Sequence, residues 1–207
     1  MEAGKDICLN RVSIAYGKQQ VLRDVDLRFA AGKITAVMGP SGLGKTTILR
    51  ILMGLQPYEG EVTGLEGKKI SCVFQDSRLL PWLTVRQNLE LVCGAEQKAI
   101  DEALALTELQ DAAQKKPEEL SGGMQRRAAL ARALAYGGDV FLLDEPFTGL
   151  DEDLKERIAE RVTKQWRAEK KTVLFVTHVQ AEADRWADEV IRLTEVPGVE
   201  PGNAIEE

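Results

Sequence analysis

The sequence lacks the features that mark disulfide-rich secreted proteins and proteins that span a membrane. Its 207 residues include three cysteines, Cys8, Cys72 and Cys93, which are far apart and form neither a Cys-x-x-Cys pair nor a zinc-binding spacing with histidine. We therefore expect buried, reduced thiols. No stretch approaches the ~18 apolar residues of a membrane span, and residues 1–10 carry charges where a signal peptide needs an apolar core. We expect a cytoplasmic protein that acts at a membrane only through a partner.

The sequence also lacks an excess of positive charge. Lys and Arg number 27 against 33 Asp and Glu, which gives a net charge of −6 and an isoelectric point near 5.1. This balance argues against the broad phosphate-binding surface that nucleic acids select, so we expect no nucleic-acid partner. With 44% hydrophobic and 29% charged residues, the composition is that of a folded chain. We expect one domain over residues 1–193 and a disordered tail over residues 194–207.

The hydrophobic pattern predicts strands and helices in an alternating order. Two segments that alternate apolar and polar residues open the chain, and later apolar runs are typical of parallel strands buried on both faces. Strands are expected over residues 7–16, 21–29, 34–38, 70–74, 140–143, 172–177 and 189–193, and helices over 46–53, 84–114, 121–135, 152–169 and 180–187. This order predicts an α/β fold with a mostly parallel sheet, an antiparallel β subdomain and an inserted α-helical subdomain at about residues 84–135.

A glycine-rich motif of the form G-x-x-x-x-G-K-[ST] lies between a predicted strand and a predicted helix. This is the P-loop or Walker A pattern, in which backbone N–H groups and a helix N-terminus surround phosphates. The lysine reaches the terminal phosphates and the next hydroxyl binds Mg²⁺. A glycine-rich turn that matches this whole pattern by chance would be far rarer than a true phosphate-binding loop. The predicted nucleotide-binding residues are Gly39, Pro40, Ser41, Gly42, Leu43, Gly44, Lys45, Thr46 and Thr47.

Two acids, Asp144 and Glu145, end the buried strand predicted at residues 140–143. In a Walker B motif the first acid holds a magnesium-bound water and the second polarises the attacking water. A strand-terminal acid pair on its own is more often a solvated cap. The upstream P-loop favours the catalytic interpretation, with Glu145 as general base and Asp144 as a metal residue.

Residues 120–127, with the sequence Leu-Ser-Gly-Gly-Met-Gln-Arg-Arg, resemble the signature of the ABC ATPase family. Ser121, Gly122 and Gly123 are predicted to begin a helix, where free N–H groups and the helix dipole form a second anion site, although an ordinary helix N-cap would look similar. The resemblance implies that these residues and Gln125 act in trans on ATP bound by a second subunit. It therefore implies a dimer, expected here to be a homodimer.

Other residues match the landmarks of this family in order. The resemblance implies that Tyr16 stacks on adenine, that Gln75 takes part in catalysis and contacts Mg²⁺ together with Thr46 and Asp144, and that Asp151 belongs to a dimer-contacting loop. His178 would contact the γ-phosphate. Each of these residues could be structural when considered alone, above all the single histidine of the chain.

The stretch at residues 73–88 looks most similar to importer ATPases of the nitrate, sulfonate and taurine group. Leu79, Leu80 and Trp82 would contact a membrane permease, although Leu-Leu-Pro-Trp could also form a buried turn. The resemblance implies ATP and Mg²⁺ as cofactors and a permease and a substrate-binding protein as partners. It also implies a place on the cytoplasmic face of the membrane. The alternatives are an exporter ATPase and a soluble ABC ATPase that remodels nucleic acid or ribosomes.

Overall fold

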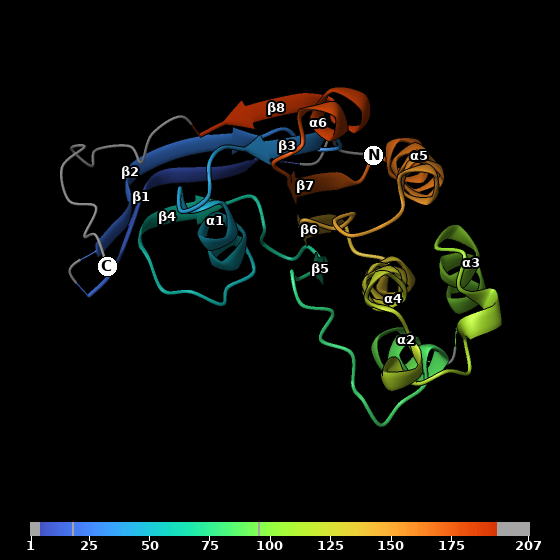
Figure 1. The fold of residues 1–207 in the computed structure, drawn as a ribbon. Helices are drawn as coiled ribbons and strands as arrows, with labels where there is room; N and C mark the ends of the chain where they lie inside the picture. The colour runs from blue at the N-terminus through green and yellow to red at the C-terminus, as the bar shows by residue number, and fades with distance from the viewer. Residues whose placement is uncertain (1–4, 18, 95, 194–207) are drawn as a thin grey trace.

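The computed structural model describes residues 5–17, 19–94 and 96–193, and the predicted tail at residues 194–207 lies outside this part (Figure 1). A five-stranded sheet occupies the centre in the order β5-β6-β7-β3-β8, and its four strand pairs are all parallel. Every residue of β3, β6 and β7 is buried, as expected for strands covered on both faces. The strands are β3 (Ile34–Met38), β5 (Ile70–Val73), β6 (Val140–Asp144), β7 (Thr172–Val176) and β8 (Glu189–Arg192).

A second, antiparallel sheet packs against one side of this core together with the first helix. It has the order β2-β1-β4 and consists of β1 (Ile7–Tyr16), β2 (Gln19–Phe29) and β4 (Glu59–Thr63). Apolar residues of β1, β2 and helix α1 (Lys45–Leu52) form one hydrophobic cluster with one face of the parallel sheet. The cluster therefore fixes α1 between the two sheets and sets the position of the loop that precedes it (Figure 1).

Three helices cover the opposite face of the parallel sheet: α4 (Gly122–Tyr136), α5 (Glu152–Ala168) and α6 (Gln180–Trp186). Their apolar side chains form a second cluster with alternate residues of the strands. Phe141 of β6 and Trp166 of α5 lie with ring centroids 5.2 Å apart. This contact ties the middle of the sheet to α5.

The remaining helices form a helical subdomain with α4. They are α2 (Val85–Cys93), α3 (Gln97–Leu106) and two short 3-10 helices, Gln110–Ala112 and Pro117–Glu119. Thr84 caps α2 in a capping box with Gln87, because the threonine side chain accepts from the Gln87 N–H and the glutamine side chain accepts from the Thr84 N–H. A third apolar cluster joins α2 and α3 to α4. Helix α4 thus belongs to both the subdomain and the central core.

The predicted fold class is confirmed, and most element ends agree within two residues. Residues 84–114, where the pattern is helical, form two helices and a 3-10 turn. The expectation of buried thiols is wrong, since all three cysteines are free but only partly buried. In β1 the alternation turns Ile7 and Leu9 into the core and leaves Cys8 on the other face. Within the described residues, no helix has both the length and the apolar character needed to cross a bilayer.

Candidate functional site

The loop at residues 39–44 leads from β3 into α1 and requires glycine at its two ends. At Gly39, with φ +147°, a Cβ atom would lie 2.5 Å from the carbonyl oxygen of Leu193, and at Gly44, with φ +80°, it would lie 2.8 Å from Leu22 Cδ2. Gly44 is the N-cap of α1 and supplies no side chain to bond the first amides of the helix. These N–H groups and the positive end of the helix dipole are therefore available for an anion.

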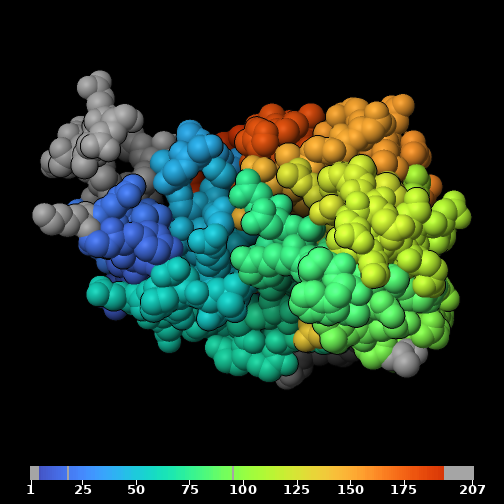
Figure 2. Space-filling model, turned by 60° about the horizontal axis from the view of Figure 1, so that its bottom comes forward, coloured from blue at the N-terminus to red at the C-terminus, as the bar shows by residue number. Residues whose placement is uncertain are grey.

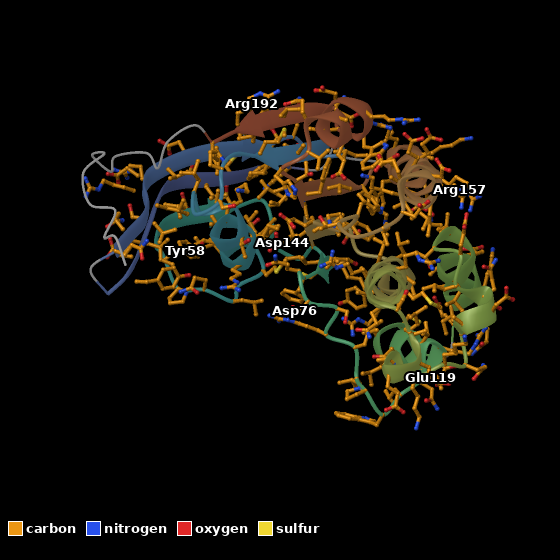
Figure 3. The ribbon with its side chains drawn as sticks, viewed as in Figure 1. Tyr58, Asp76, Glu119, Asp144, Arg157 and Arg192 are labelled. Atoms are coloured by element: carbon orange, nitrogen blue, oxygen red, sulfur yellow. The ribbon has the colours of Figure 1, made fainter. Side chains whose placement is uncertain are left out.

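A cavity of about 370 Å³ lies at this helix start. The ammonium group of Lys45 donates to the carbonyl oxygens of Gly39 (2.7 Å) and Pro40 (2.6 Å), so the loop itself holds the cation beside the cavity. Asp144, labelled in Figure 3, lines the cavity from the end of β6. The lining residues are Val21, Ser41, Gly42, Gly44, Lys45, Thr46, Thr47, Gln75, Asp144, Glu145 and Val176.

Asp144 and Thr46 have the properties of a magnesium site. Asp144 is only 6% exposed, and burial raises the pKa of its carboxyl group, an effect that a hydrogen bond with Thr46 opposes. A buried carboxylate beside a hydroxyl is suited to a cation. In the described part of the chain no group of three His, Cys, Asp or Glu could form a complete metal cage. This sparse donor set fits Mg²⁺, which is usually bound through one or two carboxylates, substrate phosphates and waters.

Glu145, which lines the cavity, is held in an unusual backbone conformation. Its φ is +50°, in the left-handed region, which costs free energy in a residue with a side chain. Its N–H donates to the Val176 carbonyl (3.2 Å), which joins the end of β6 to the end of β7. Its Oε1 lies 3.1 Å from Nδ1 of His178, and its Oε2 accepts a longer bond from the Thr148 hydroxyl at 3.4 Å. The carboxylate is thereby directed by groups from two loops.

The signature segment lies outside the cavity lining of its own chain. The Ser121 hydroxyl caps α4 by accepting from the Met124 N–H at 3.3 Å. The amide of Gln125 donates backward to the Pro117 carbonyl at 2.9 Å. Gly123 faces the segment before α5, because a Cβ there would meet the Gly149 carbonyl oxygen at 3.4 Å. Asp151 caps α5 by accepting from the Leu154 N–H, so the signature and the Asp151 loop are neighbours.

The structure thus brings together only part of the predicted set. Residues of the P-loop, Gln75, Asp144 and Glu145 share one cavity, and His178 joins them through Glu145. Leu43 packs on the core instead of lining the cavity. Tyr16 is 43% exposed at the end of β1 and does not line it either. The signature residues and Asp151 are also absent from the lining.

Sequence reasoning missed several residues that shape the site. Val21 and Val176 line the cavity, and apolar strand residues such as these carry no functional signal. Two arginines of α4 were also missed: Arg126 donates to the Thr148 carbonyl, and Arg132 donates to the carbonyls of Ser77 (3.0 Å) and Arg78 (2.7 Å). The arginine-rich start of α4 was visible in the sequence, but its partners depend on packing.

The fold and the cavity together define a P-loop nucleotide-binding protein. A family profile described as ABC transporter matches residues 22–148 of the chain. The chain is 40% identical over 193 residues to an aliphatic sulfonates import ATP-binding protein, SsuB, of Bacillus licheniformis, an alignment that covers 87% of this chain and 75% of that protein. It is 39% identical over 207 residues to the nitrate import ATP-binding protein NrtC of a Synechocystis species, covering 92% of this chain and 31% of that protein.

Solved structures of ABC transporter cassettes are also similar to this chain. The dimeric structure of MJ0796, a bacterial ABC transporter cassette, superposes with a TM-score of 0.83 at 34% identity, covering 92% of this chain and 95% of that one. A dimeric post-hydrolysis state of the same cassette, bound to ADP and Pi, has a TM-score of 0.82 at 33% identity, also with 92% of this chain and 95% of that one covered. The chain belongs to the ABC transporter family and is an ATP-binding subunit with ATPase activity.

Proposed function

We propose that this chain hydrolyses MgATP as one of two identical subunits and drives import of a small anion through a separate membrane permease. The observation that carries the proposal is the convergence of Lys45, Asp144 and Glu145 on one cavity at the start of α1. A cation for phosphates, a buried acid for a metal and a second acid for water are the groups that phosphoryl transfer to water requires. Residues 1–193 would act as one ATPase domain, with the helical subdomain at about residues 84–135.

Binding would rest on the P-loop and its neighbours. The amides of residues 39–47 and the Lys45 ammonium would bind the phosphates, and Tyr16 would stack on adenine. Thr46, Asp144 and Gln75 would hold Mg²⁺ directly or through water, which would neutralise phosphate charge. Lys45 already lies beside the cavity in its contacts with the loop carbonyls, so a small rotation of its side chain would reach the phosphates.

Hydrolysis would use the Glu145–His178 pair. Glu145 would accept a proton from the attacking water or orient that water, and His178 would contact the γ-phosphate. The 3.1 Å distance between Glu145 Oε1 and His178 Nδ1 supports a joint role, since it places the two side chains in direct contact.

The second subunit would complete each site with Ser121, Gly122, Gly123 and Gln125. Their place outside the cavity lining supports action in trans. The N-terminal amides of α4 would then contact phosphates bound by the partner, and Asp151 would lie at the dimer contact. The dimeric cassettes that this chain resembles support the arrangement.

The permease would dock beside the segment between β5 and α2. Trp82 is 66% exposed there, which argues against the buried-turn alternative. Figure 2 shows residues around 70–90, in green, at the surface between the cyan part of the chain and the yellow-green α4 region. Arg132 holds this segment from α4 and would couple docking to the signature helix. The named importer relatives support nitrate or sulfonate as the class of solute. A substrate-binding protein would be a further partner.

The proposal is tested by purifying the tagged chain from detergent-solubilised native membranes and identifying what accompanies it by mass spectrometry. A multi-span protein together with loss of anion uptake on deletion of this chain would support import from the cytoplasmic face. A multi-span protein with loss of efflux would indicate an exporter. Recovery of ribosomes or nucleic acid alone would indicate a remodelling ATPase.

A further inference from the structure

The turn that carries His178 is closed by the side chain of the residue before it. Thr177 follows β7 and is 2% exposed. Its hydroxyl oxygen accepts a bond from the N–H of Val179 at 3.1 Å, across the intervening His178. A threonine that bonds the amide two residues later forms a compact turn. His178 therefore occupies the middle position of a turn whose shape depends on one hydroxyl group.

That hydroxyl is itself bonded to a buried acid. Thr177 Oγ1 donates to Glu182 Oε2 at 2.6 Å, and Glu182 Oε1 lies 3.2 Å from the ammonium group of Lys155. The side chains of Glu182 and Lys155 are 8% and 11% exposed. Lys155 also contacts the exposed Glu152 at 2.8 Å. The chain of contacts thus runs from the first turn of α5, through α6, to the turn at His178.

Stability alone is a weak reason for such an arrangement. Taking two charges out of water costs free energy that their attraction only partly returns, and apolar side chains of similar size are often as good or better. A carboxylate with both oxygens engaged does, however, fix direction: Glu182 can satisfy Lys155 and Thr177 together in few orientations. A buried ion pair therefore suits the task of holding a turn in one position.

We infer that Thr177 and Glu182, anchored by Lys155, are positioning residues that hold the His178 imidazole against Glu145. The inference rests on the proposed role of His178 and adds residues that neither the P-loop nor the signature contains. Because Lys155 lies one turn after Asp151 in α5, the same contacts connect the two loops that carry Asp151 and His178.

The first test uses the fact that His178 is the only histidine in the sequence. With the tag removed, the NMR spectrum of the imidazole contains signals from one ring. Thr177→Val keeps the side-chain shape but removes the hydroxyl, so we expect these signals to shift and broaden. Thr177→Ser keeps the hydroxyl and should restore them. The matched control is Thr163→Val, since Thr163 is also buried and bonds only within α5. Identical imidazole signals in Thr177→Val and the natural protein would overturn the inference.

The second test is kinetic. We expect Thr177→Val to lower kcat for ATP hydrolysis about tenfold or more, as misplacement of a group by a fraction of an ångström can do, while KM for ATP changes much less. Glu182→Gln retains an acceptor for Thr177 but loses the ion pair, so its kcat should lie between that of Thr177→Val and that of the natural chain. Thr177→Ser should recover most of the kcat.

A double-mutant cycle separates positioning from a general loss of folding. If Thr177 acts through His178, Thr177→Val should lower single-turnover hydrolysis little further in a His178→Ala background. Equal losses in both backgrounds would overturn the inference. A natural chain without ATPase activity, or a fully active His178→Ala variant, would contradict the proposed function instead, and the imidazole signals would then decide the positioning inference alone.

Discussion

Nδ1 of His178 lies 3.1 Å from Oε1 of Glu145, although 33 positions separate the two residues in the chain. The contact forms because β6 and β7 are parallel neighbours, so that the residues after their carboxyl ends meet at the same edge of the sheet. Glu145 retains its left-handed backbone at φ +50° through the bond of its N–H to Val176. A conformation that costs free energy and aims a carboxylate into a cavity is typical of a functional site.

We expect Glu145→Gln to preserve ATP binding and to lower turnover by at least about a hundredfold, because the amide cannot accept a proton from water. The unhydrolysed ATP should then trap the closed dimer. Phosphate release would measure turnover, and size-exclusion chromatography with and without MgATP would detect the dimer. A variant with normal turnover would contradict the role proposed for Glu145.

We expect Lys45→Ala to weaken ATP binding by about 10- to 100-fold, since it removes a charged hydrogen-bond donor to the phosphates. Isothermal titration calorimetry would measure the Kd. Lys164→Ala is the control, because Lys164 is an exposed lysine of α5 away from the cavity. Equal weakening by both variants would indicate an effect of net charge and not of the site.

Asp144 should limit the stability of the nucleotide-free chain. Burial raises the pKa of its carboxyl group, so the folded state binds the proton more tightly than the unfolded state does. This contribution stabilises the fold at acidic pH and is lost as pH rises through the folded pKa. We therefore expect Asp144→Asn to raise Tm by a few degrees at neutral pH.

The effect should depend on pH and on ligand. The Tm difference between Asp144→Asn and the natural chain should narrow as pH falls toward the raised pKa of the folded carboxyl group, which then takes up its proton. MgATP should stabilise the natural chain more than the variant, because Asn lacks the charge that attracts the metal. Thermal unfolding with and without MgATP would measure both effects. A lower Tm for the variant without ligand would show that the ionised carboxylate stabilises the fold.

Trp82 should matter for the permease and not for folding. Its side chain is 66% exposed, so Trp82→Ala should change the free energy of unfolding by less than about 0.5 kcal/mol. Recovery of the permease in co-purification should fall strongly, since exposed tryptophans are frequent binding hot spots. The control is Val190→Ala, on the exposed edge strand β8. Unchanged recovery with Trp82→Ala would exclude this residue from the docking surface.

Local signals in the sequence predicted much of the fold. The helical pattern predicted from residue 84 onward matches α2, whose N-cap is Thr84, and the apolar run before Asp144 identified β6. The partly exposed cysteines were not predicted, because the expectation came from residue type alone. Cys72 lies on β5, an edge strand, and packs against the first hydrophobic cluster while it stays partly exposed.

The site was predictable where a motif is continuous in the chain and not where it depends on packing. The P-loop residues are consecutive, at positions 39–47. One loop and the start of one helix are therefore enough to bring them to a common cavity. The contact of Lys155 with Glu182 instead requires α5 to lie beside α6, and the contacts of Arg132 require α4 to pass the segment after β5. Arg157 of α5, labelled in Figure 3, is a further case: its guanidinium group lies 3.2 Å from the carboxylate of Glu108, which follows α3. No local pattern identifies such partners.

Arg132 should hold the segment that follows Gln75 in place. Its guanidinium group donates to the carbonyls of Ser77 and Arg78, and burial lowers its pKa. Arg132→Met keeps the length of the aliphatic stem but removes both donors, so the segment should open more often. Because Arg78 is an exposed residue in this segment, trypsin can report the opening by cleaving after it.

We expect cleavage after Arg78 to become about tenfold faster in Arg132→Met, since two bonds from a charged donor are lost. The matched control is Arg185→Met, because Arg185 pairs with Glu156 and Glu160 at the surface and does not contact the segment. Mass spectrometry of the fragments would give the rate at each site. Equal acceleration in both variants would indicate general destabilisation, and no acceleration in Arg132→Met would show that the segment is held by its other contacts, such as the stacking of Arg78 over Phe74.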